Sequence, residues 1–196
     1  MRDIMSKIAI LTDSSCDIPQ EMAEKYNIDI MSFHILLDDV DYVERESCSN
    51  EEFYAKMRAA KGVPSTAAIT PIQFCEKYCQ YVDEGYTDVI HVPINRSGSS
   101  TYNNAVMAQG MLREERPEHH LQLHLNDPHT YSMPFGWYLC EMARKLQNGA
   151  EISHVIHEFE TQMNKMEIIL GPYSLKQMKK SGRISAAAAV MGELMG

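Results

Sequence analysis

The sequence contains no long apolar run. Near its beginning, the apolar residues 8–11 are too few for the hydrophobic part of a secretory signal. No other stretch approaches the roughly 18 apolar residues that a membrane-spanning helix needs. We therefore expect a cytoplasmic protein that is not inserted into a membrane.

Positive charge is also scarce. Lys and Arg together number 18 and Asp and Glu 27, which gives a formal net charge of -9. Phosphate backbones and anionic lipid surfaces attract proteins with an excess of positive charge. The balance therefore argues against nucleic acid and anionic membranes as partners. An anionic small molecule would need local positive potential or hydrogen-bond donors aimed at it.

The sequence has neither a disulfide framework nor a common nucleotide-binding motif. Its five cysteines are odd in number and stand in hydrophobic or helical contexts, which is typical of reduced cytosolic thiols. Cys75 and Cys79 share one face of a predicted helix, but no His or acidic residue completes a metal-ligand spacing. We interpret both as core residues. His154 and His157 lack a third ligand and are interpreted as a surface pair. No G-x-G-x-x-G or Walker pattern occurs.

The most informative stretch that is present covers residues 95–102, with the sequence NRSGSSTY. It follows the apolar residues 89–93, a predicted buried strand, and precedes a predicted helix. Backbone N–H groups and a helix N-terminus can bind an anion at such a turn, and small side chains let the anion approach. The turn holds no obvious nucleophile–base pair. It therefore suggests that an anionic group is held there and not cleaved.

Strands alternate with helices along the chain. Predicted strands cover residues 7–12, 28–37, around 42, 87–93, 120–126 and 167–171. Predicted helices cover residues 19–25, 49–61, 70–85, 100–115, 132–146, 152–166, 175–180 and 185–194, and residues 63–69 are expected to form a loop. This alternation predicts an α/β fold with a twisted, mostly parallel sheet covered by helices on both faces. The polar loops 13–17, 95–101 and 127–132 then follow strand ends, where such sheets bind ligands.

Five motifs occur in a fixed order along almost the whole chain. They are TDSSCDIP at residues 12–19, EFY at 52–54, PSTAAITP at 64–71, SSTYNNA at 99–105 and SLKQMKKSGRIS at 174–185. Together they resemble the motifs of the DegV family of fatty-acid-binding proteins. The family patterns are T-D-S-x-x-D-[IL]-P, E-F-Y, P-x-T-S-Q-P-S-P, S-G-T-Y-x-x-A and L-x-x-L-x-x-G-G-R-I-S.

The resemblance implies a carrier with no catalytic residues and no cofactor. A long-chain fatty acid would lie in an apolar tunnel between an α/β domain and a smaller α+β domain. Thr66, Ser99 and the adjacent Ser100 would hold the carboxylate. In bacteria that have a fatty acid kinase, such a carrier presents the acyl chain to the kinase for acyl phosphate formation. Arg96 stands where the family usually has a Ser, and we hypothesise that it adds a cation near the carboxylate.

The resemblance also implies how the chain is divided. Family members continue well beyond the fifth motif, so the chain resembles a truncated or reduced member. We expect a DegV-like α/β domain at residues 1–165 and the beginning of an incomplete second domain at residues 166–196. We also expect weaker lipid binding than in a longer relative.

Two alternatives stay open. One is a structural or decayed DegV-like protein without lipid, because the 95–96 positions and the length depart from the family pattern. The other is an enzyme acting on a small-molecule phosphate ester, with Asp13 as nucleophile or metal ligand. Aspartyl-phosphate chemistry needs a second Asp two residues after the first, and position 15 is Ser. The spacing therefore disfavours the enzyme.

Overall fold

The computed structural model describes residues 6–169 and residue 171. It divides into two compact units. The first contains residues 6–33 and 68–168, and the second contains His34–Ala67. The predicted helices at 175–180 and 185–194 and the fifth motif lie outside the described residues. No strand forms in the described part of the predicted segment 167–171.

A four-stranded sheet forms the centre of the first unit. Its order is β2 (Ile28–Met31), β1 (Ile8–Asp13), β6 (Asp88–Val92) and β7 (Gln122–Leu125), and every neighbouring pair is parallel. From β1 the chain first adds β2 on one side and later β6 on the other. The topological switch therefore lies between β1 and β6, and the loops after these strands are the expected ligand-binding region.

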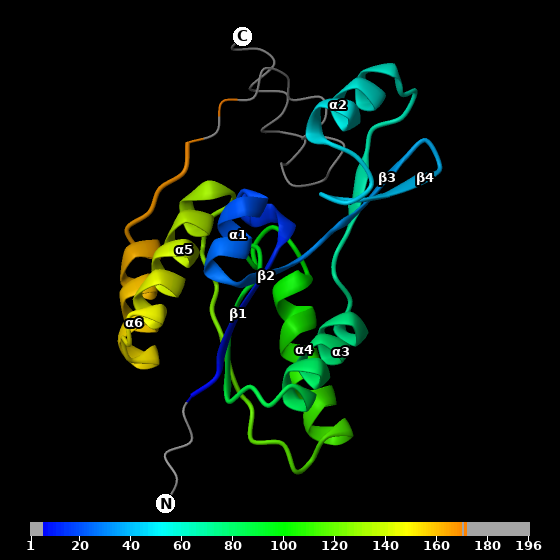
Figure 1. Cartoon of the computed structure of the whole chain (residues 1–196). Helices are drawn as coiled ribbons and strands as arrows, with labels where there is room; N and C mark the ends of the chain where they lie inside the picture. The colour runs from blue at the N-terminus through cyan, green and yellow to red at the C-terminus, as the bar shows by residue number, and fades with distance from the viewer. Residues whose placement is uncertain (1–5, 170, 172–196) are drawn as a thin grey trace, which may run out of the picture. The chain divides into compact units, whose positions relative to one another are not determined.

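Helices cover both faces of this sheet, as the alternating pattern predicts. Figure 1 shows α5 (Met133–Gln147) and α6 (Ile152–Met163) on one side of β1, and α3 (Pro71–Asp83) and α4 (Thr101–Glu115) on the other. The short helix α1 (Gln20–Tyr26) contributes to the core on the α5 and α6 side.

The side chains of β1 explain this double covering. Ile10 packs into the core that contains Phe135 of α5, whereas Ala9 and Leu11 pack into the core that contains Phe74 of α3. Successive side chains of a strand point to opposite faces, so an uninterrupted apolar strand requires an apolar layer on both sides.

The second unit contains an antiparallel sheet of order β4 (Val40–Val43), β3 (His34–Leu37) and β5 (Ser65–Ala67). Asp38 and Asp39 form the hairpin turn between β3 and β4, with φ of 47° and 65°. Asp tolerates this left-handed conformation better than most residues. The helix α2 (Asn50–Ala59) follows, and Ser49 and Glu52 form the capping box that the sequence predicts.

Two sequence predictions differ from this arrangement. The single strand predicted at 28–37 is two strands in separate sheets, and between them the Phe33 N–H donates to Ser14 Oγ at 3.0 Å. The predicted loop 63–69 contains β5, whose partner is β3. Residues 34–67 form a unit of their own, because their strands pair in their own sheet. The boundary expected at residue 165 stays a prediction.

Candidate functional site

Hydrogen bonds join the three polar loops at the carboxyl edge of the parallel sheet. The buried Asp13, which ends β1, accepts a hydrogen bond from the Ile94 N–H at 2.7 Å, just beyond β6. In the loop before α5, the Ser132 N–H donates to the Ser15 carbonyl at 3.1 Å, and the Ser132 hydroxyl donates to Asp17. The loops 13–17, 95–101 and 127–132 therefore form one edge, as the sequence predicts.

The turn after β6 is built around the side chain of Asn95. Its Oδ1 accepts from the Ser97 N–H at 2.9 Å and from the Ser97 hydroxyl at 2.8 Å, and its carbonyl accepts from the Gly98 N–H at 3.1 Å. An Asn side chain that imitates a backbone turn in this way fixes the loop locally. At Gly98 an added Cβ would lie 2.4 Å from Tyr131 Oη, so a larger residue would displace that ring.

Ser99 and Thr101 form a hydroxyl pair where the turn enters α4. Their oxygens are 2.8 Å apart, and Ser99 Oγ also accepts from the Thr101 N–H at 3.2 Å. Thr101 is fully buried, whereas Ser99 is half-buried. When the Thr101 hydroxyl donates to Ser99, the Ser99 proton is left to donate to a ligand. The pair can therefore orient one hydroxyl donor toward an anion.

The other two candidates on this loop differ in their surroundings. Ser100 is exposed and immediately precedes α4, and its side chain makes no capping hydrogen bond. Arg96 donates its backbone N–H to Asp127 Oδ1 at 3.4 Å, and its Nε lies 3.7 Å from Asp127 Oδ2. The Arg96 side chain is 64% exposed and that of Asp127 is 8% exposed. Asp127 therefore offsets part of the positive charge that Arg96 would offer an anion.

Thr66 lies in the other unit. It is an exposed residue of β5 and stands opposite Ile35 of β3 in the antiparallel register. The structure therefore brings Ser99, Ser100 and Arg96 together on one loop of the first unit and assigns Thr66 to the second.

Sequence reasoning missed two residues, Asp127 beside the 95–101 turn and Asn104 in the helix that follows it. Asp127 interacts with Arg96 as described above and also accepts from the His129 N–H at 3.0 Å. Asn104 of α4 donates its side-chain N–H to the Ile69 carbonyl at 2.8 Å and so ties α4 to the segment before α3. The position of Asn104 inside the motif SSTYNNA was the available signal, but no spacing rule identifies Ile69 as its partner.

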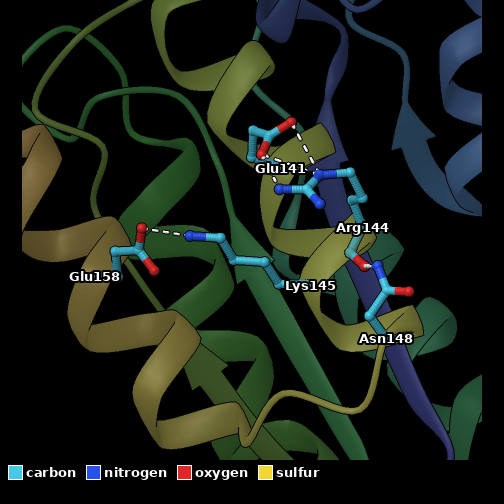
Figure 2. A network of polar contacts seen from close by, with 5 residues as sticks. All are labelled: Glu141, Arg144, Lys145, Asn148 and Glu158. Atoms are coloured by element: carbon cyan, nitrogen blue, oxygen red, sulfur yellow. Dashed lines mark hydrogen bonds and ion pairs between the residues drawn. The ribbon is translucent and has the colours of Figure 1, made fainter.

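A hollow between α5 and α6 is a second surface feature of the first unit. Its volume is about 230 Å³, and its lining includes Trp137 and Phe159. Figure 2 shows the ion pair between Lys145 of α5 and Glu158 of α6, with Glu141 and Arg144 paired at 2.7 Å along α5. Small-molecule pockets usually measure about 300–1,000 Å³ and are mostly apolar. This charged and smaller hollow does not suit a long acyl chain.

The fold defines a class, an α/β protein with a parallel sheet whose polar loops are hydrogen-bonded to one another at its carboxyl edge. The described part of the chain contains no helix long and apolar enough to cross a membrane. The chain belongs to the DegV family, because the family model for uncharacterised DegV proteins matches residues 7–196.

The chain is also similar to curated DegV domain-containing proteins. A DegV domain-containing protein of Clostridium perfringens is 28% identical over 193 residues, covering 98% of this chain and 66% of the relative. Another from Staphylococcus aureus is 29% identical over 190 residues, covering 96% of this chain and 64% of the relative. The chain thus spans about two thirds of the length of the curated relatives that it matches.

Solved structures share the fold. A DegV family protein from Thermus thermophilus, described as fatty acid binding, matches with a TM-score of 0.83 at 23% identity, over 97% of this chain and 65% of that protein. A DegV lipid-binding protein from Thermotoga maritima matches with a TM-score of 0.71 at 28% identity, over 81% of this chain and 55% of that protein.

Proposed function

We propose that this protein binds a long-chain fatty acid in an apolar tunnel and presents it to a fatty acid kinase, which forms the acyl phosphate. In this proposal it is a carrier and not an enzyme, and the fatty acid is its ligand without any cofactor. The observation that carries the proposal is the match to the lipid-binding DegV protein of Thermotoga maritima, at 28% identity and a TM-score of 0.71. The kinase partner is inferred from the family resemblance.

We assign the carboxylate to the hydroxyls of Thr66, Ser99 and Ser100, with Arg96 as an added cation. Support for Ser99 comes from its hydrogen-bonded pairing with Thr101, which leaves one hydroxyl proton for a ligand. Ser100 is supported by its exposure next to Ser99. Thr66 is supported by its place in the PSTAAITP motif and by its exposure.

Apolar burial must supply most of the affinity. Each buried CH₂ contributes roughly 0.8 kcal/mol, so a long acyl chain gains on the order of 10 kcal/mol. Association costs about 4–15 kcal/mol, and a hydrogen bond to a charged group contributes about 1.5–3 kcal/mol. The hydroxyl donors therefore set the orientation of the acid, and the acyl chain determines how tightly it binds.

The phosphate-ester enzyme is disfavoured by the surroundings of Asp13. One carboxylate oxygen accepts from the Ile94 N–H at 2.7 Å, and the other accepts from the Ser15 N–H at 3.1 Å. Asp13 is fully buried, so these bonds fix the loop edge and leave little access for a phosphate or a metal ion.

Mass spectrometry of the purified protein tests the proposal directly. An organic extract of heat-denatured protein, measured in negative-ion mode, should contain about one equivalent of a long-chain fatty acid. A folded protein that carries no acid and binds none in a titration would contradict the carrier proposal and favour the structural or decayed alternative.

Ser99→Ala tests the carboxylate assignment. We expect at least about tenfold weaker binding of palmitate, because a hydrogen bond to a charged group is lost. Ser97→Ala is the matched control, since its hydroxyl donates to Asn95 within the turn. Equal affinities of the two variants would contradict the role of Ser99.

Arg96→Ala tests the added cation separately. We expect a loss of only a few-fold, because the guanidinium is exposed and Asp127 already faces it. An unchanged affinity would remove Arg96 from the site and leave the hydroxyl assignment intact.

A further inference from the structure

Two helices of the first unit bring three metal-ligating side chains together. Cys75 and Cys79 are one helical turn apart on the same face of α3, and Glu115 is the last residue of α4. The two Sγ atoms and a carboxylate oxygen of Glu115 all lie within 4.8 Å of one another. Cys79 Sγ donates to Glu115 Oε2 at 3.7 Å. Glu115 follows Cys79 by 36 residues, so local spacing in the sequence does not show this acidic group beside the two cysteines.

The spacing of these atoms suits a tetrahedral zinc ion. Bonds of about 2.3 Å to sulfur and 2.0–2.2 Å to oxygen place the ligand atoms of a tetrahedral site roughly 3.6–3.8 Å apart. The three ligand atoms lie within 4.8 Å of one another, so the distances between them would have to shorten by about 1 Å or less to reach tetrahedral geometry. Side-chain rotation on two packed helices can supply shifts of that size.

The chemistry of the ligands selects the metal. Two sulfur ligands favour Zn²⁺ over Mg²⁺ and Ca²⁺, which prefer oxygen. Three protein ligands would leave a fourth position for water, and Glu115 is exposed, so solvent can reach that position. Two thiolates and one carboxylate around Zn²⁺ carry one net negative charge. The neighbouring Arg116, which also pairs with Asp83 at 3.7 Å, is placed to offset part of this charge.

Metal binding would change the protonation of the thiols. Cys75 and Cys79 are 2% and 8% exposed. Burial raises the pKa of Cys75 to about 12 and also raises that of Cys79. Both are therefore neutral without metal. Binding would form two Zn–S bonds and one Zn–O bond and release two protons to solvent.

We infer that Cys75, Cys79 and Glu115 form a zinc-binding site that links α3 to α4. The site is separate from the 95–101 turn and does not depend on the proposed lipid carrier function. The two helices already pack through the core that contains Phe74, Ala105 and Leu112. A bound ion would add a metal link at the end of α4.

Titration of the reduced protein with Co²⁺ tests the inference. We expect one equivalent to produce thiolate-to-cobalt charge-transfer absorption and the visible bands of tetrahedral Co²⁺, and Zn²⁺ to abolish both. Calorimetry of Zn²⁺ binding in buffers of different ionisation enthalpy should report about two protons released. Absence of the charge-transfer absorption in the folded, reduced protein would overturn the inference.

Variants locate the bound metal. Glu115→Gln changes an exposed residue that need not disturb folding, and should weaken Zn²⁺ binding at least about tenfold. Glu114→Gln is its matched control on α4 and should bind as the wild type does. Cys75→Ser with Cys79→Ser should abolish the charge-transfer absorption, whereas Cys48→Ser should retain it. Absorption that persists in the double variant, or an affinity unaffected by Glu115→Gln, would overturn the site.

Discussion

At the scale of single residues, His91 is the least expected feature of the core. It lies on β6 within a sheet that is otherwise apolar at its centre, and it is fully buried. Its Nδ1 is 2.7 Å from Tyr78 Oη, and Phe74 packs against its ring at a centroid distance of 4.9 Å. Within the described residues its Nε2 has no hydrogen-bond partner. Burial lowers the pKa of His91 to about 3, because a charged imidazolium would be poorly solvated there.

This burial predicts a specific loss of stability in acid. The pKa of His91 is about 3 in the folded protein and near the ordinary value of 6.5 in the unfolded chain. The unfolded chain therefore binds the proton first. The contribution of neutral His91 is complete above pH 6.5 and is lost as the pH falls toward 3. The free energy of unfolding should fall by up to about 1.4 kcal/mol per pH unit from this group in that window.

Denaturant unfolding between pH 7 and pH 4 would measure this effect, with His91→Gln as the comparison. Other groups also titrate in this range, so the informative quantity is the difference in slope between the two proteins. We expect a shallower slope for the variant, whatever its absolute stability. If the free energy of unfolding changed with pH by the same slope in both proteins, the assignment of this acid sensitivity to His91 would be contradicted.

At the scale of elements, the contact between α5 and the turn after β1 depends on a glycine. Gly136 is buried in α5, and an added Cβ would lie 2.1 Å from the Cys16 carbonyl oxygen and 3.0 Å from Ile18 Cγ1. A backbone carbonyl cannot rotate away as a side chain can. Gly136 is therefore required for α5 to approach the 13–17 loop closely. The arrangement of loops at the carboxyl edge of the sheet depends on this approach.

Gly136→Ala should destabilise the protein by about 2–3 kcal/mol, because it overpacks this contact. Gly110→Ala is the control in another helix: nothing lies within 4 Å of an added Cβ at this exposed position of α4. The control should stabilise the protein by about 0.5–1 kcal/mol, since Ala favours a helix more than Gly does. Thermal unfolding of both variants would measure the difference, and equal shifts would contradict the steric argument.

At the scale of the whole molecule, ligand binding and folding are linked. A fatty acid that binds only the folded protein raises the free energy of unfolding with its concentration. At a free palmitate concentration one hundred times its Kd, the increase should be about 2.7 kcal/mol. Delipidated protein should therefore unfold at a higher temperature in palmitate than in a matched concentration of a short-chain carboxylate. An identical melting temperature in both would contradict the carrier proposal.

The sequence alone determined most of the first unit, because its signals are local. Apolar runs flanked by turns located β1, β6 and β7, and the capping box at Thr70 located the beginning of α3. In the second unit, the capping box at Ser49 located the beginning of α2 in the same way. Helices cover both faces of the sheet because its strands are apolar on both faces. Motif order identified the family, whereas the roles of Thr66, Ser99, Ser100 and Arg96 stay predictions.

Tertiary structure decided what depends on contacts between distant segments. Residues 28–37 read as one apolar strand, but only pairing partners reveal that β2 joins β1 and β3 joins β4 and β5. The short strand β5 shows no alternation of apolar and polar residues. It forms because its backbone pairs with the edge of β3. Glu115 meets Cys79 from 36 residues away, which no local spacing shows. The physical reason is the same in each case. The periodicity of side chains indicates which face of a strand or helix is buried, whereas the fold determines which distant segment lies against that face.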